Sequence, residues 1–119
     1  MKINLDSITD RNQLISLQKA DQNLIKLRSQ ALDNPQSNDH SYFFVPDDML
    51  MHHTSSVKTD YSADRIVVPS TLHSQVLQLA HDIPAAGHLG IRKTHARLQP
   101  HFYWPRMLKD VTHFCKLCE

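Results

Sequence analysis

The chain has few of the residues that mark secreted, repetitive or membrane-spanning proteins. Its 119 residues include two glycines and six prolines, which argues against low complexity. The two cysteines are three positions apart and cannot form an ordinary disulfide framework, so free thiols or a metal site in a reducing compartment are expected. The N-terminus lacks the apolar stretch of a signal peptide, and no segment approaches membrane-spanning length. We expect a protein that is not secreted and does not associate with membranes.

Carboxylates arranged for catalysis are also scarce. Glu119 is the only glutamate, and the aspartates are dispersed over predicted helix caps and turns, so no acid pair or triad can be assembled. The sequence contains no glycine-rich phosphate loop and no nucleophile elbow. It therefore predicts a non-enzymatic protein without a small-molecule substrate.

The apolar pattern predicts a mainly α chain with a small antiparallel β meander. Helices are expected over about residues 10–20 and 21–33, with Asp10 and Asp21 as their N-terminal caps. Three short strands are expected at Tyr42–Val45, Met49–His53 and Arg65–Val68. The length is sufficient for one domain with an appended subdomain.

The last third of the chain predicts three further helices. Pro69 and Ser70 begin the first, which ends at His81; the second starts near Gly90 and ends at Pro100; Pro105 begins the third. The inward positions expected on the first and third are Leu72, Val76, Leu79, Ala80, Leu108, Val111 and Phe114. Phe102, Tyr103 and Trp104 are expected to form an aromatic plug between these helices, with Trp104 in the core rather than stacked on DNA.

Two histidines and two cysteines occur in the order of a zinc site. Zn²⁺ prefers imidazole nitrogen and thiolate sulfur in a closed tetrahedron, and two ligand pairs far apart in sequence can hold a small domain together. The pairs are His81 with His88, and Cys115 with Cys118. A turn containing Gly87 should bring His88 back toward His81. The alternative is that the cysteines are reduced residues packed on a helix.

The remaining histidines are predicted to lie elsewhere. Solvent-facing positions are expected for His40, His52 and His53, and helix or loop surfaces for His73 and His101. An apolar packing position is expected for His95. His113 is the only plausible reserve ligand, although its side chain should point away from that of Cys115.

The segments AHD, GHLG, RKT, ARL, FYWP and KDV, at their spacings, resemble the H2C2 or HHCC zinc-binding domain of gypsy-type retrotransposon integrases. The resemblance covers residues 66–119 and implies a zinc-stapled helical bundle. Residues 1–65, with the runs DRNQLISLQKADQNLIKLRSQAL and YFFVPDDMLM, resemble the N-terminal extension that leads into this domain.

The resemblance also implies which residues hold zinc. His81, His88 and Cys118 fall on ligand positions, whereas the fourth ligand would lie three residues beyond Cys118, past Glu119. The domain is therefore expected to be truncated at its C-terminal end. Two outcomes are open: Cys115, on the same helix face as Cys118, replaces the fourth ligand, or the site stays incomplete and binds zinc weakly.

In these integrases catalysis belongs to a separate ribonuclease-H-like core, so the resemblance implies a non-catalytic module. Its expected roles are DNA binding, association with other integrase subunits or with itself, and DNA integration of a transposable element. Residence in the nucleus, or otherwise in the cytoplasm, follows from those roles.

Cations concentrated in the last third suggest a DNA-binding face, since each cation near a phosphate releases a counterion. The residues concerned are Arg92, Lys93, Arg97, Arg106 and Lys109. A solvated helix surface explains the same charges. Two rival functions remain: a protein–protein interaction module of a domesticated or truncated retroelement gene without DNA binding, and a catalytic fragment that needs a downstream core.

Overall fold

Helices and short strands alternate along the chain in the computed structural model, which describes residues 9–31, 40–44, 48–56, 61–83, 87–88 and 90–117. The helices are α1 (Arg11–Ala20), α2 (Ile25–Gln30), α3 (His73–His81), α4 (Ile91–Leu98) and α5 (Met107–Leu117), with 3₁₀ turns η2 (Gln22–Leu24) and η3 (Ser70–Leu72). The strands are β1 (His40–Phe44), β2 (Leu50–Ser56), β3 (Tyr61–Val67), β4 (Asp82–Ile83), β5 (Gly87–His88) and β6 (Phe102–Tyr103). The prediction of a mainly α fold with a small β component is confirmed.

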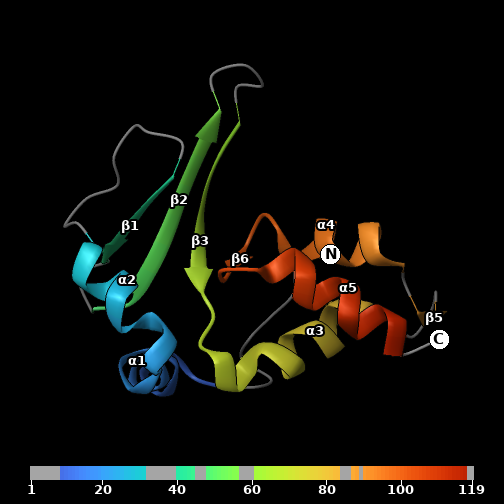
Figure 1. The fold of residues 1–119 in the computed structure, drawn as a ribbon, viewed down its shortest axis with the longest axis horizontal. Helices are drawn as coiled ribbons and strands as arrows, with labels where there is room; N and C mark the ends of the chain where they lie inside the picture. Colours follow the sequence, from blue (N-terminus) through green and yellow to red (C-terminus); the bar gives the residue numbers. More distant parts are fainter. Residues whose placement is uncertain are drawn as a thin grey trace.

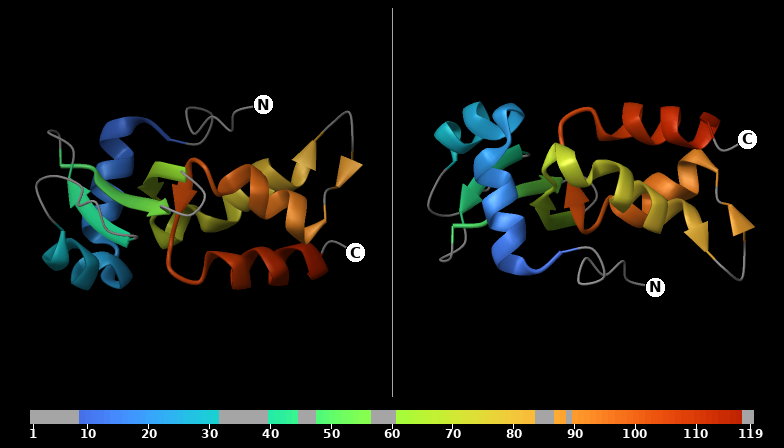
Figure 2. Two further views of the ribbon diagram at one scale, coloured as in Figure 1. Left: turned by 90° about the horizontal axis from the view of Figure 1, so that it is seen from above. Right: turned by 90° about the horizontal axis from the view of Figure 1, so that it is seen from below.

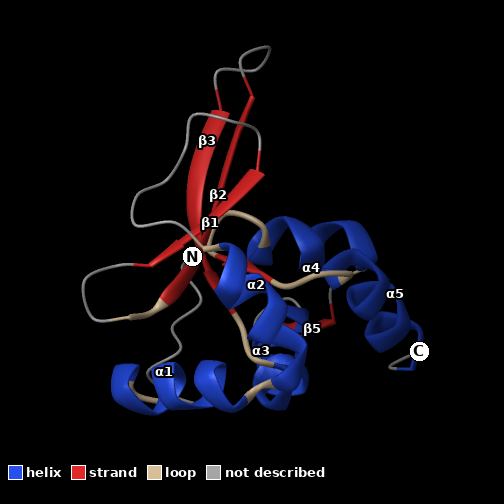
Figure 3. Ribbon diagram, turned by 60° about the vertical axis from the view of Figure 1, so that its left-hand side comes forward, coloured by secondary structure: helices blue, strands red, loops and turns tan. Residues whose placement is uncertain are grey.

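The main sheet has the strand order β1-β2-β3-β6, and its first three strands form the predicted antiparallel meander. The fourth strand was not predicted. Residues Phe102 and Tyr103 pair in parallel with Ile66 and Val67. Figures 1 and 3 show the far part of the β2–β3 hairpin projecting away from the helices.

The N-terminal helices begin at the two predicted caps. The Asp10 carboxylate accepts a hydrogen bond from the Gln13 N–H at 2.7 Å, and Asp21 accepts one from the Asn23 N–H at 2.9 Å. These bonds satisfy backbone donors that have no partner within a helix. The break at Asp21 separates α1 from α2, which ends at Gln30, earlier than predicted.

Among the C-terminal helices, α3 ends at His81 and α4 follows Gly90, as predicted. Helix α5 begins at Met107, whereas the prediction placed its start at Pro105. Its buried stripe is therefore Met107, Val111 and Cys115, spaced i, i+4 and i+8. The inward position predicted for Leu108 is wrong, because a residue next to Met107 is turned by about 100° around the helix; Leu108 is 54% exposed.

Two hydrophobic clusters occupy the two faces of the sheet. The larger contains Trp104 and Val76 and draws residues from α1, β6 and the helices α3, α4 and α5. The smaller consists of Leu24, Leu50 and Val67, with Tyr103 packed against it. Trp104 is buried, as predicted, but Phe102 and Tyr103 face opposite clusters because side chains alternate along a strand.

Gln18 of α1 fastens the N-terminal helices to the sheet. Its amide nitrogen donates to the carbonyls of Leu50 and Val67 at 3.1 and 2.7 Å, and its amide oxygen accepts from the Leu50 N–H at 2.8 Å. Figures 1 and 2 show α1 and α2 at one end of the molecule and the group α3, α4 and α5 at the other. The boundary between residues 65 and 66 stays a prediction, and the larger cluster contains residues from both sides of it.

Three of the histidine predictions are wrong. The side chain of His53, expected to face solvent, is 15% exposed and lies 2.6 Å from the Asp64 carboxylate. His52 is 1% exposed rather than solvent-facing, because it follows Leu50 on the inward face of β2, where it stacks on Tyr103 at 3.9 Å and accepts a hydrogen bond from Arg65. His73 is half-buried against Trp104, with ring centroids 4.1 Å apart. The side chain of His40 lies outside the described residues. None of the described helices is long and apolar enough to cross a membrane.

Candidate metal centre

The predicted ligands His81 and Cys115 meet where α3, α4 and α5 converge. His81 is the last residue of α3 and is 2% exposed; Cys115 lies on the buried stripe of α5 and is 6% exposed. Their Nδ1 and Sγ atoms are 3.5 Å apart. Thr94 of α4 completes the group, with its hydroxyl oxygen 3.3 Å from His81 Nδ1 and 3.7 Å from Cys115 Sγ.

The separation of His81 and Cys115 fits two ligands of one zinc ion. With Zn–N and Zn–S bonds of about 2.0–2.1 and 2.3 Å and a tetrahedral angle, the nitrogen and sulfur of a ligand pair lie roughly 3.6 Å apart. The donor types are also those that zinc prefers, and both side chains are buried. A thiol–imidazole hydrogen bond satisfies the same distance, so the geometry is compatible with zinc without requiring it.

The backbone of His88 returns to the same end of α3. Strand β5 pairs antiparallel with β4, and the Cα partner of His88 is Asp82, the residue after His81. The predicted return of the chain is thus present in the backbone. The side chain of His88 and the whole of Cys118 lie outside the described residues. Within the part of the chain that the structure describes, no group of three or more His, Cys, Asp or Glu side chains is gathered around one point.

Residues 68–119 match the family model of the integrase zinc-binding domain. The match begins after β3 and includes all three helices that surround His81 and Cys115. Domains of this family are non-catalytic and bind zinc, so the match points to a zinc-binding segment. No solved structure matches the chain.

Two residues within the matched segment have roles that the sequence analysis missed. The Thr94 hydroxyl lies between the two candidate ligands, where it can orient His81 by hydrogen bonding. Arg97 donates from Nη1 to the Ala80 carbonyl at 2.9 Å and so satisfies a backbone acceptor at the C-terminus of α3. Thr94 lies one turn before buried Leu98 on the same face of α4, and a polar residue on this otherwise apolar face could have indicated its contacts. Arg97, next to Leu98, lies at the edge of that face.

The other predicted DNA contacts divide between two helices. Arg92 and Lys93 are exposed in the first turn of α4. Arg106 and Lys109 are exposed at the beginning of α5. Arg97 differs from these four because its guanidinium is partly buried by its bond to α3. His113 is exposed, in agreement with the prediction that it points away from Cys115.

Proposed function

We propose that this chain is the zinc-binding module of a gypsy-type integrase, joined to its N-terminal extension, and that it binds DNA and brings integrase subunits together. The observation that carries the proposal is the family match over α3, α4 and α5, whose inward faces hold His81 and Cys115 in contact. The module would act beside a separate catalytic core during DNA integration. Its place of action would be the nucleus.

The residues that would hold zinc are His81, His88, Cys118 and Cys115, with Cys115 as the replacement for the fourth ligand. The burial of Cys115 and its distance from His81 support the replacement. When bound, zinc would supply folding free energy by joining the C-terminal ends of α3 and α5. Thr94 would orient the imidazole, and Arg97 would keep the end of α3 in place.

The residues that would contact DNA phosphates first are Arg92 and Lys93. Both are exposed on α4, and neither forms an ion pair within the described residues. Binding through such cations is largely independent of DNA sequence and weakens as salt rises. A few phosphate contacts predict a loss of roughly one to three decades in affinity between low and moderate salt.

The proposal is tested by measuring zinc content and duplex-DNA binding on the same preparation. We expect close to one zinc per chain and a salt-dependent affinity that the double variant Arg92→Gln/Lys93→Gln reduces. The matched control is Lys19→Gln/Lys26→Gln, which removes the same charge from α1 and α2. Zinc without salt-dependent DNA binding would favour the protein–protein interaction module, and absence of zinc would reject the metal centre.

A further inference from the structure

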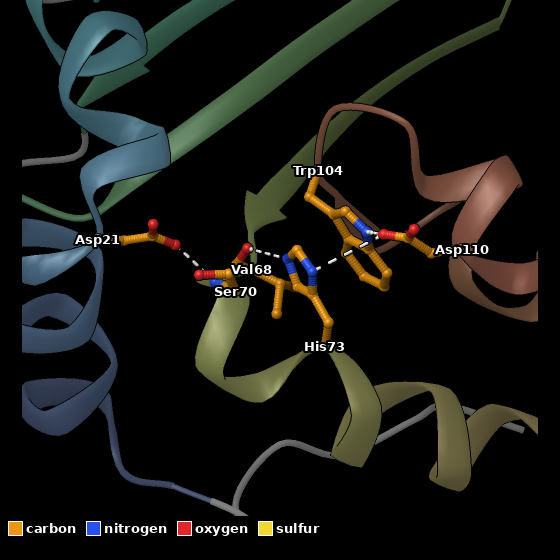
Figure 4. Close-up of polar contacts among 6 residues, drawn as sticks. All are labelled: Asp21, Val68, Ser70, His73, Trp104 and Asp110. Atoms are coloured by element: carbon orange, nitrogen blue, oxygen red, sulfur yellow. Dashed lines mark hydrogen bonds and ion pairs between the residues drawn. The ribbon is translucent and has the colours of Figure 1, made fainter. Parts of the chain in front are cut away.

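A pocket of about 600 Å³ lies between the N-terminal helices and the beginnings of α3 and α5. Its walls include Asp21 and Asn23 at the beginning of η2, Ser70 and His73 from the start of the α3 region, and Trp104. The Asp21 carboxylate accepts a hydrogen bond from the Ser70 N–H at 2.6 Å, which joins the two sides (Figure 4). The pocket therefore requires the N-terminal segment to be docked on the zinc-binding domain.

The two carboxylates in the wall are already engaged by protein donors. Burial raises the pKa of Asp21, but the N–H groups of Ser70 and Asn23 outweigh it and leave that pKa below its ordinary value. Asp110 accepts a hydrogen bond from the Trp104 indole N–H at 2.8 Å and lies 3.9 Å from His73 Nδ1. Figure 4 shows these contacts. Their negative charges are thus partly offset from within the protein.

The pocket lining also includes three basic residues. Lys109 and His113 line the pocket from one face of α5, at positions i and i+4, and Arg106 lines it from the turn before α5. All three are exposed, and none forms an ion pair within the described residues. They remain available to an anionic ligand.

Arg106 also has an unusual backbone. Its φ is 69°, a left-handed conformation that glycine adopts freely and that residues with a Cβ adopt only with strain. Its exposed side chain contributes nothing to the hydrophobic core. The turn before α5 adopts this conformation and places the exposed guanidinium at the pocket; left-handed residues recur at ligand-binding sites.

We propose that this pocket binds the phosphate of a nucleotide, with Arg106 and Lys109 donating hydrogen bonds to phosphate oxygens and His113 at the rim. A guanidinium suits phosphate because its planar donors can engage two oxygens at once. The volume falls within the range of roughly 300–1,000 Å³ that is usual for small-ligand sites. The inference rests on the proposed DNA binding only if the nucleotide belongs to a strand.

The test is an NMR titration of the intact chain that follows the indole N–H of Trp104, the only tryptophan, on the pocket wall. A deoxynucleoside 5′-monophosphate should shift this signal and the backbone amides of Lys109 and His113, whereas the unphosphorylated nucleoside should not. Equal shifts from both compounds, or none from either, would overturn the proposal. A 5′-phosphorylated single strand that binds more tightly than the monophosphate would identify a strand end as the source; weaker binding would identify a free nucleotide.

Variants separate this pocket from a general attraction of anions. Arg106→Gly should weaken monophosphate binding by about tenfold, the usual effect of losing a charge-assisted hydrogen bond, while thermal stability is kept or raised because glycine relieves the strain. Lys116→Gln, an exposed charge on α5 outside the pocket, is the matched control and should bind normally. Unchanged binding by Arg106→Gly, or equal losses in both variants, would reject the site.

Monophosphate binding and duplex-DNA binding can also be tested separately, so either proposal can fail without the other. Arg92→Gln/Lys93→Gln should lose duplex affinity and still bind the monophosphate, because neither residue lines the pocket. A chain that binds monophosphate but no duplex DNA would contradict the proposed DNA binding and leave the pocket intact. A chain that binds duplex DNA but no monophosphate would contradict the pocket alone.

Discussion

Cys115 packs against His81 in the structure, while the family resemblance places a zinc ligand at Cys118. Both residues can ligate one ion only if the last turn of α5 presents them together, as i and i+3 positions allow. A buried thiol on a helix is otherwise an ordinary core residue. The two cysteines therefore respond differently to substitution under each interpretation.

Cys118→Ser should lower zinc affinity by at least about tenfold, because a serine hydroxyl is a poor substitute for a thiolate. Cys115→Ser should do the same if Cys115 is the fourth ligand. Competition with a chromophoric chelator measures both affinities, and His53→Ala on β2 serves as the control. Normal zinc affinity in Cys115→Ser would restrict that residue to a packing role, and normal affinity in both variants would remove the cysteines from the site.

His73 should make stability depend on pH. Burial lowers its pKa from the ordinary value, and the bond to the Val68 carbonyl and the charges of Asp110 and Asp21 oppose this only in part. The unfolded chain then binds this proton at higher pH than the folded chain does. Stability should therefore fall as the pH decreases below the unfolded value of about 6.5 and stop falling below the folded pKa.

His73→Phe keeps an aromatic ring against Trp104 and removes the titrating group. Urea denaturation between about pH 5 and 7 should give a shallower pH dependence in this variant than in the original chain. His95, whose pKa is lowered by burial and by Arg65, contributes in the same direction, so some slope should remain. An unchanged slope would show that protonation of His73 does not lower the free energy of unfolding.

At the scale of elements, the docking of α1 depends on one buried amide. Gln18→Ala would leave two carbonyls and one N–H at Leu50 and Val67 without their partner. We expect a loss of roughly 2–4 kcal/mol in the free energy of unfolding, because buried polar groups lose their hydrogen bonds. The midpoint of urea denaturation measures this loss.

Gln30→Ala is the matched control for that change. Gln30 is exposed on α2, and its substitution should alter stability by no more than about 0.5 kcal/mol. Equal effects of the two substitutions would mean that Gln18 stabilises the protein through helix propensity and not through its hydrogen bonds to the sheet.

The positions of most elements were predictable because local signals mark them. Asp10, Asp21 and Gly90 stand before helices, and His81 ends α3 as expected. The start of α5 was misplaced because proline favours a first helical position, but here the chain first makes a turn at Arg106 with positive φ. Leu108 is exposed because the buried stripe runs through Met107, Val111 and Cys115, which shares only Val111 with the predicted one.

At the scale of the molecule, the chain should unfold as one unit. The larger cluster contains Leu14 and Met49 from the N-terminal segment together with Trp104 and Val111, so neither part has a separate core. Removing zinc with a chelator should therefore lower a single cooperative transition, because ligand binding is coupled to folding. Calorimetry with and without chelator measures this.

Two separate transitions, of which only the second responds to the chelator, would instead support independent units divided near residue 65. An unchanged transition would indicate that zinc contributes nothing to stability. Chelation of a chain carrying His81→Ala is the control, since its transition should no longer respond.

The sequence by itself determined the class of fold, the order of the helices, the burial of Trp104 and the return of the chain between His81 and His88. These follow from periodicity, capping residues and turn residues, whose effects act within a few positions. The spacing of its motifs also sufficed to indicate the family that residues 68–119 match.

The tertiary structure alone decided which distant residues meet. Pairing of β6 with β3, the bond between Gln18 and the sheet, and the contact of Cys115 with His81 join residues many positions apart. The local sequence pattern does not predict such contacts, because they depend on how whole elements pack once their apolar faces are buried. For the same reason the pocket beside Arg106, formed by three separate segments, could not be anticipated from the order of residues along the chain.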